Sequence, residues 1–203
     1  MPKSRSRRDN NLRLHVAYLA ARLMAEDGVA DYGTAKTKAA RQAGLTDANS
    51  LPDNHEIEAA LREYQGLYQK EDQPEHLRHL REVAVRVMRE FADFRPVLVG
   101  SVLSGTAGQY SDVNLQIFTD DVKALTMFLL NGRYRFEERA KRVNRGDRFD
   151  EVPQITLEYQ DATVSLTVLD PDDERSFAKA RHEAGERARL ADVEALLASN
   201  APP

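Results

Sequence analysis

The sequence predicts an α+β protein, in which a helical N-terminal module precedes a mixed sheet with flanking helices. Two observations carry this prediction. Residues 1–70 repeat apolar side chains at helical spacing, without strand-like alternation. After Pro96, short apolar or alternating runs are separated by turn signals and one further helical segment, an order typical of a sheet packed against helices. The short polar run 69–73 is the predicted linker between the two parts.

Three helices are expected in the N-terminal module. The first, over 12–27, is predicted by apolar residues three or four apart and by a stop at Gly28. The second, over 34–43, has an alanine face. The third follows Pro52, with Asp53 or Asn54 as its cap and Glu56 reaching back. Its expected core face consists of Ile57, Leu61, Tyr64 and Tyr68.

A second domain is expected from 74 to 172, followed by a C-terminal helix and tail over 173–203. Its predicted elements are a helix from Pro74 to Pro96, strands at 97–99 and 112–118, a helix at 122–131 capped by Asp120 or Asp121, an exposed strand at 133–143, a loop at 144–151, and a hairpin of 154–159 with 163–169.

Composition excludes several classes of protein. Hydrophobic residues make up 41% of the 203 residues and charged residues 31%, as in globular domains. No apolar run approaches the roughly 20 residues that cross a bilayer, and no hydrophobic signal segment follows the basic start. The absence of cysteine excludes disulfides, thiol catalysis and thiolate metal sites. A cytoplasmic protein without a membrane partner is therefore expected.

The net charge of −4 is unevenly distributed. Residues 1–45 contain nine lysines or arginines and four acids, so the rest of the chain is acidic. Lys38, Arg41 and Gln42 share the polar side of the second predicted helix. Lys36, Lys38 and Arg41 are candidate contacts for nucleic acid, since such cations neutralise phosphates. A face turned to water explains the same pattern.

The stretch most informative about function is "PVLVGSVLSGTAGQYSDVNLQIFTDD", residues 96–121. It is not a P-loop, because the lysine of G-x-x-x-x-G-K-[ST] is absent. It is not a serine-hydrolase elbow, because no G-x-S-x-G occurs. What it does contain is a Gly100-Ser101 turn after an apolar strand, then Asp112 and Asn114 at the start of the next strand.

This spacing resembles the signature of the DNA polymerase beta-like nucleotidyltransferase superfamily, in which Gly-Gly or Gly-Ser precedes an acid, an apolar residue and a second acid. The segments "AKTKAARQAGL" and "SLPDNHEIEAALREYQ" together with this motif also resemble a group of short bacterial proteins with such a domain and no known activity. The resemblance implies a nucleotidyltransferase-like mixed sheet. It also implies that Gly100 and Ser101 bind nucleotide phosphate, and that Asp112 binds Mg²⁺ or Mn²⁺.

Asn114 departs from the signature, because a neutral amide stands where the second carboxylate is expected. A third acid is expected on the strand at 163–169, where Ser165 and Thr167 are the matching positions. With one carboxylate of three, the charge that assembles a two-metal site is largely lost. The interpretation is a pseudoenzyme that binds a nucleotide or a nucleic-acid end, RNA included.

Two other functions remain open at this point. Asp120, Asp121, Glu158 or Asp170 could replace a missing acid and make the chain an active metal-dependent nucleotidyltransferase. Alternatively, the fold could serve only as the scaffold of a protein-binding adaptor or antitoxin-like partner, whose basic helix docks on an acidic surface. Separately, the motif itself could arise by chance, with Asp112 serving as a turn cap.

Overall fold

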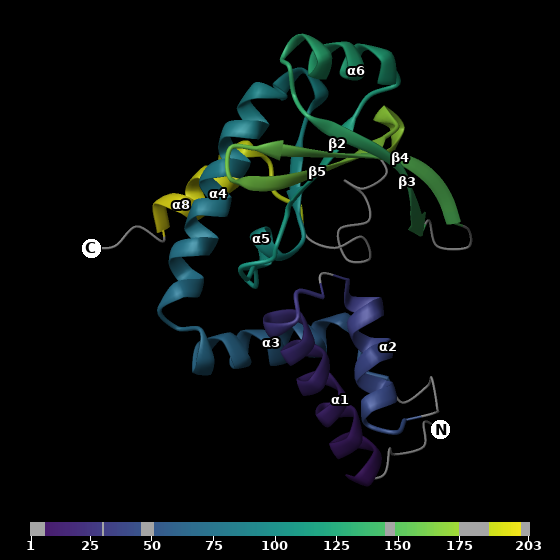
Figure 1. Ribbon diagram of the computed structural model, residues 1–203, viewed down its shortest axis with the longest axis vertical. Coiled ribbons are helices and arrows are strands. Elements are labelled where there is room, and N and C mark those ends of the chain that lie inside the picture. The colour runs from purple at the N-terminus through teal and green to yellow at the C-terminus, as the bar shows by residue number, and fades with distance from the viewer. Residues whose placement is uncertain (1–6, 30, 46–50, 145–148, 175–186, 200–203) are drawn as a thin grey trace. The chain divides into compact units, whose positions relative to one another are not determined.

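The computed structural model describes residues 7–29, 31–45, 51–144, 149–174 and 187–199 (Figure 1). Their contacts form two compact units, one up to His76 with Gly108–Ser111, and one of Leu77–Ala107 with the chain from Asp112 onward. We call them the helical unit and the α/β unit. The division falls inside a helix, a few residues beyond the polar run 69–73 that was the predicted linker.

The helical unit contains α1 (Arg7–Glu26), α2 (Tyr32–Gln42) and α3 (Asn54–Tyr68). The first helix begins five residues before its predicted start, because nothing between Arg7 and Leu12 breaks a helix once the apolar face has nucleated it. The unit's main core is built largely from small residues, which allow the helices to approach closely: Val16, Ala17, Ala20, Leu23, Ala35, Ala39, Ala40 and Ile57.

The start of α3 is held by the predicted capping box, with Asp53 as the cap. The Glu56 N–H donates to Asp53 Oδ1 at 2.9 Å, and the Asp53 N–H donates to Glu56 Oε2 at 2.7 Å. The prediction for Tyr68 was wrong. Tyr64 is buried, but Tyr68 is 65% exposed, because it is the last residue of the helix; its ring lies tilted against that of Tyr64, with 4.6 Å between the ring centroids, instead of entering the core.

The α/β unit is a mixed α+β structure, as predicted. Its elements are α4 (Asp72–Glu90), the 3₁₀ turn η2 (Ala92–Phe94), β1 (Val97–Val99), α5 (Ser101–Ser104), β2 (Val113–Phe118), α6 (Val122–Asn131), β3 (Phe136–Asn144), β4 (Phe149–Tyr159), β5 (Ala162–Leu169) and α8 (Leu190–Ser199). Asp121 caps α6, as expected, through a hydrogen bond from the Ala124 N–H.

Two predictions in this half were wrong. The described residues of the predicted loop at 144–151 are strand, since β3 ends at Asn144 and β4 begins at Phe149 and pairs with β3; residues 145–148 lie outside the described ranges. The single C-terminal helix is replaced by the shorter α8, and Ala188 before it pairs with Leu98 on the outer edge of β1, at 2.8 and 3.0 Å. The rest of that predicted helix, 175–186, also lies outside the described residues. Backbone pairing of β1 outweighs helix propensity there.

The sheet has the strand order β1-β2-β5-β4-β3, with β2 and β5 parallel and the other neighbours antiparallel (Figure 1). Because side chains alternate, each strand contributes to two faces. One face is apolar and forms the main core with α4, α6 and α8. The other, here called the polar face, includes Asn114, Gln116, Gln154, Thr156, Ser165 and Thr167, which are brought level by the register.

No helix in the described part of the chain combines the length and apolar character required to span a bilayer.

Candidate functional site

The Gly100 turn is a tightly closed loop after β1. Gly100 has φ 77° and ψ −156°, a backbone conformation available essentially only to glycine. The Ser101 carbonyl then accepts hydrogen bonds from the N–H groups of Gly105, Thr106 and Ala107, at 2.9, 3.0 and 3.1 Å. The chain therefore folds around a single carbonyl oxygen and leaves the half-buried Ser101 side chain at the start of α5.

Asn114 lies directly against this turn. Val99 pairs with Asn114, and a Cβ built on Gly100 would be 3.7 Å from both Cβ and Nδ2 of Asn114. Asn114 Nδ2 donates to the backbone oxygen of Asp112 at 3.2 Å. The structure thus brings Gly100, Asn114 and Asp112 together, and the amide has a local role that a carboxylate could not fill, because a carboxylate has no hydrogen to donate.

Asp112 is a half-buried carboxyl group directly before β2. Burial raises the pKa of the Asp112 carboxyl above its ordinary value. Within the described part of the chain, neither a cation nor a hydrogen-bond donor contacts the carboxylate. A desolvated carboxyl without a partner is typical of functional sites, because keeping it there costs stability.

Arg81 on α4 is a buried residue that sequence reasoning missed. It is 4% exposed, and its guanidinium donates to the carbonyls of Val102 at 3.1 Å and Leu103 at 3.2 Å. Burial lowers the pKa of Arg81, and no carboxylate of the described chain is close enough to raise it. Arg81 therefore holds α5 by its last carbonyls and places an uncompensated positive charge beneath the turn. Its helical spacing predicts only a position on α4, so the sequence contains no signal for this contact.

Of the two positions expected to carry a third acid, one lies beside Asn114 and the other beside Gln116. Ser165 is the register partner of Asn114, and Thr167 is the partner of Gln116. Both hydroxyl residues are 6% exposed. Among the described residues, no group of three histidine, cysteine, aspartate or glutamate side chains could hold a metal ion. The donors around Asp112 therefore do not fit a two-metal centre, which requires several carboxylates.

One alternative acid lies level with Asp112. Glu158 on β4 pairs with Thr163 on β5. Val113 and Val164 are register partners, and Asp112 and Thr163 are the residues directly before them, so Asp112 and Thr163 are level. Glu158 is thus on the polar face, two strands from Asp112, or roughly 10 Å between backbones. The other three acids lie beyond the opposite ends of β2 and β5, and Asp121 is occupied in capping α6.

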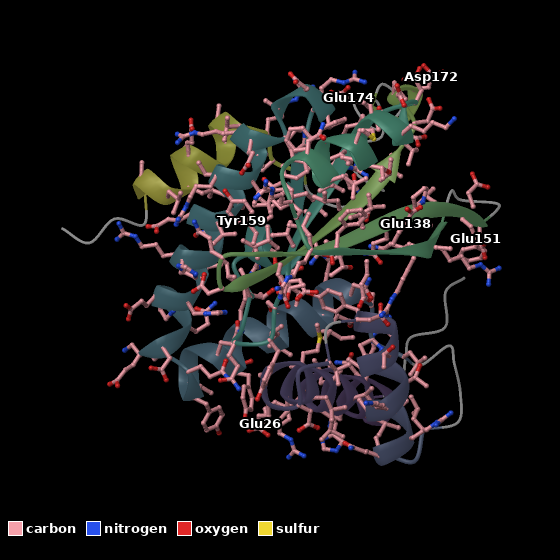
Figure 2. All side chains as sticks on the ribbon, turned by 45° about the horizontal axis from the view of Figure 1, so that its top comes forward. Glu26, Glu138, Glu151, Tyr159, Asp172 and Glu174 are labelled. Atoms are coloured by element: carbon pink, nitrogen blue, oxygen red, sulfur yellow. The ribbon has the colours of Figure 1, made fainter. Side chains whose placement is uncertain are left out.

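A cleft of about 610 Å³ lies at that opposite end. Figure 2 shows Glu151 and Tyr159 at opposite ends of β4, and the cleft is at the Glu151 end. Asp120, Asp150, Glu151 and Asp170 are among its lining residues. It is therefore separate from the Gly100 turn, which lies near the start of β2.

The basic candidates for nucleic-acid contact belong to the helical unit. Lys36 Nζ donates to Asn54 Oδ1 at 3.3 Å. Lys38 and Arg41 lie on the exposed side of α2, opposite the buried Ala35 and Ala39. Lys38 and Arg41 therefore share an exposed face, whereas Lys36 lies on another side of α2 and ties it to α3.

We expect Gly100→Ala to lower the free energy of unfolding of the α/β unit by about 1–3 kcal/mol, because alanine cannot adopt this backbone conformation without strain. The new methyl group itself would meet Asn114 at ordinary contact distance, so the cost is conformational and not steric. Urea unfolding measures the change. Gly66→Ala is the matched control, since that helical glycine has nothing within 4 Å of an added Cβ; an equal loss in both variants would contradict the prediction.

In comparisons with known proteins, no family model matches the chain, and no curated protein is significantly similar to it.

Proposed function

We propose that the α/β unit is a nucleotidyltransferase-fold domain that binds a nucleotide or a nucleic-acid end and does not transfer nucleotides. The observation that carries the proposal is the contact between the glycine-only turn and Asn114, which places Ser101 and Asp112 at one end of the polar face. Backbone N–H groups of such a turn suit phosphate oxygens. The buried Arg81 cation beneath the turn favours an anionic ligand in the same place.

The loss of catalysis is inferred from the donors that surround Asp112. An active site of this chemistry uses carboxylates to hold the metal ions that bridge the phosphates. Here the next residue on the same face of β2 is Asn114, whose amide donates to the backbone. The side chains beside this face on β5, Ser165 and Thr167, are hydroxyls. Asp112 is left as a single carboxylate, able to accept a hydrogen bond from the ligand or to contribute one ligand to a Mg²⁺ or Mn²⁺ ion. No step of a reaction is assigned to such an ion.

The proposal predicts that a nucleoside triphosphate stabilises the protein. At about 100 times the dissociation constant, binding adds about 2.7 kcal/mol to the folded state, which corresponds to roughly 5–10 °C in Tm. The measurement is a thermal-shift screen of the four ribonucleoside triphosphates, with and without Mg²⁺ or Mn²⁺. Gly100→Ala should lose the shift and Gly66→Ala should keep it. No shift under any condition would overturn the proposal and favour the adaptor function.

An active enzyme is the second candidate, favoured by the position of Glu158 level with Asp112 on the polar face. The two functions differ in an assay with a labelled triphosphate and an RNA or protein acceptor. The proposed binder transfers no label. Transfer that is lost in both Asp112→Asn and Glu158→Gln, but kept in the exposed Glu137→Gln variant, would establish the enzyme.

A further inference from the structure

A proline lies where the cleft opens at the outer end of β4. The pairing of β4 with β5 ends at Gln154 and Thr167, although both strands continue beyond these residues. The Glu158 N–H donates to the Arg135 carbonyl, directly before β3, and backbone groups alternate along a strand, so Pro153 faces β5. Pro153 has no N–H to donate, and the ladder stops there. From this point β4 pairs with β3 alone, and the cleft of about 610 Å³ lies between this ribbon, the end of β5 and the start of α6.

The cleft has apolar walls, and its charged groups are all acids. Val122, the first residue of α6, and Val152 and Pro153 on β4 are only partly buried, and Phe149 is 58% exposed. The lining residues contain no lysine, arginine or histidine, and they include four carboxylates: Asp120, Asp150, Glu151 and Asp170. Pockets of this size with apolar walls and a few polar groups are typical of small-molecule sites. The cleft therefore favours a ligand with an apolar body and positive charges.

Two of these carboxylates have no partner. Within the described chain, neither a cation nor a hydrogen-bond donor contacts the carboxylate of Asp120 or of Glu151. Asp170 is exposed and accepts the Asp172 N–H at 2.8 Å. The three acids come from different segments: the turn before α6, β4, and the residue after β5. Like charges around one cleft repel each other and attract cations, and no group of three in the described chain could hold a metal ion.

A cation beside the cleft already rests on its aromatic wall. Arg142 on β3 is the register partner of Glu151, yet its guanidinium lies over the Phe149 ring, 4.4 Å from the centroid. This contact indicates that the ring accepts positive charge. Arg142 forms no ion pair with Glu151 among the described contacts, so the Glu151 carboxylate stays available to a ligand.

We propose that this cleft binds an aliphatic polyamine, a ligand whose ammonium groups are joined by short methylene chains. The methylene groups pack on Val122 and Pro153. The ammonium groups pair with Asp120, Glu151 and Asp170 around them. A metal ion makes no use of the apolar walls, and a nucleotide is repelled by the acids. The site is separate from the Gly100 turn and does not depend on the proposed nucleotide binding.

The test uses the full-length protein and spermidine as the probe, titrated calorimetrically without nucleotide at about 0.15 M salt. We expect Asp120→Asn and Glu151→Gln each to lower the affinity about threefold, and the double variant about tenfold, because each removes one exposed ion pair. Phe149→Ala should lower it about two- to fivefold by removing the aromatic wall. Glu137→Gln is the matched control. This exposed carboxylate lies outside the cleft and pairs with Arg139, so its loss removes the same charge and should leave the affinity unchanged.

Four results would overturn the inference. The first is no binding of spermidine, and the second is equal affinity for the wild type and the double variant. The third is a loss for Glu137→Gln as large as for Glu151→Gln, because the attraction would then follow net charge and not the cleft. The fourth is an arginine-rich peptide that binds through Asp120 and Glu151 when spermidine does not, which would make the cleft a peptide-docking surface. None of these results bears on nucleotide binding, which the thermal-shift screen with triphosphates measures.

Discussion

Replacing Phe91 by alanine is expected to lower the free energy of unfolding of the α/β unit by about 3–5 kcal/mol. Phe91 is fully buried, and its ring lies 4.9 Å from that of Phe128 and 5.7 Å from that of Tyr134. Alanine would lose this apolar burial and leave a cavity that the rigid sheet and α4 cannot close. Urea unfolding followed by circular dichroism measures the loss.

The control for Phe91 is the exposed aromatic residue at the start of β4. Phe149 is 58% exposed, and its ring contacts the Arg142 guanidinium at 4.4 Å. Phe149→Ala removes that exposed cation–π contact, which is worth about 0.5–1 kcal/mol, and leaves no buried cavity. A Phe91→Ala variant no less stable than Phe149→Ala would show that the aromatic cluster around Phe91 is not the packing centre described here.

Replacing Arg13 by methionine is expected to lower the free energy of unfolding of the helical unit by about 2–3 kcal/mol. Arg13 Nε lies 2.6 and 2.8 Å from the two oxygens of Glu56, and its Nη1 donates to the Leu51 carbonyl at 2.6 Å. The Arg13 side chain is only 12% exposed, so its loss removes the donor to the Leu51 carbonyl and to Glu56 Oε1, while Glu56 Oε2 keeps the Asp53 N–H. The comparison is Arg22→Met on the same helix, whose partner Glu26 is 3.7 Å away and exposed; its loss should be about 0.5 kcal/mol or less.

The Arg13 effect should depend on pH in a defined direction. The hydrogen bond from Arg13 is the main cause that lowers the pKa of Glu56 in the folded protein. A lowered folded pKa means that the stabilisation is complete above the pKa of the unfolded chain, about 4.3, and is lost as pH falls through the folded value. The difference between wild type and Arg13→Met, measured by urea unfolding, should therefore be constant near pH 7 and shrink below about pH 4. A difference that grows in acid would contradict this account.

Local patterns predicted most of the elements and part of the candidate site. The capping box at Asp53 and the cap at Asp121 follow from contacts within three residues, which the sequence shows directly. The alternation over residues 112–118 predicted both β2 and its buried face. The glycine at position 100 was identified as part of a turn, and its φ of 77° explains why glycine is needed there.

The residues that sequence reasoning missed act across the fold. Arg81 reaches carbonyls more than twenty residues away, and Lys141 and Arg187 donate to Thr167 and Gln116, on strands to which neither belongs. Helical spacing or strand alternation places such residues on an element but says nothing about which distant atoms they contact. The same limit applies to Tyr68, which has the spacing of a core residue but lies at the end of its helix.

The sequence by itself determined the fold class, the positions of the main helices and strands, and the absence of a second acid at Asn114. These are properties of short segments, because helix periodicity, strand alternation and caps depend on neighbours in the chain. Only the tertiary structure decided that Asn114 contacts Gly100, that Ser165 lies beside it, and that Glu158 is level with Asp112. Strand order and register are set by packing between segments distant in sequence, so no local pattern encodes them.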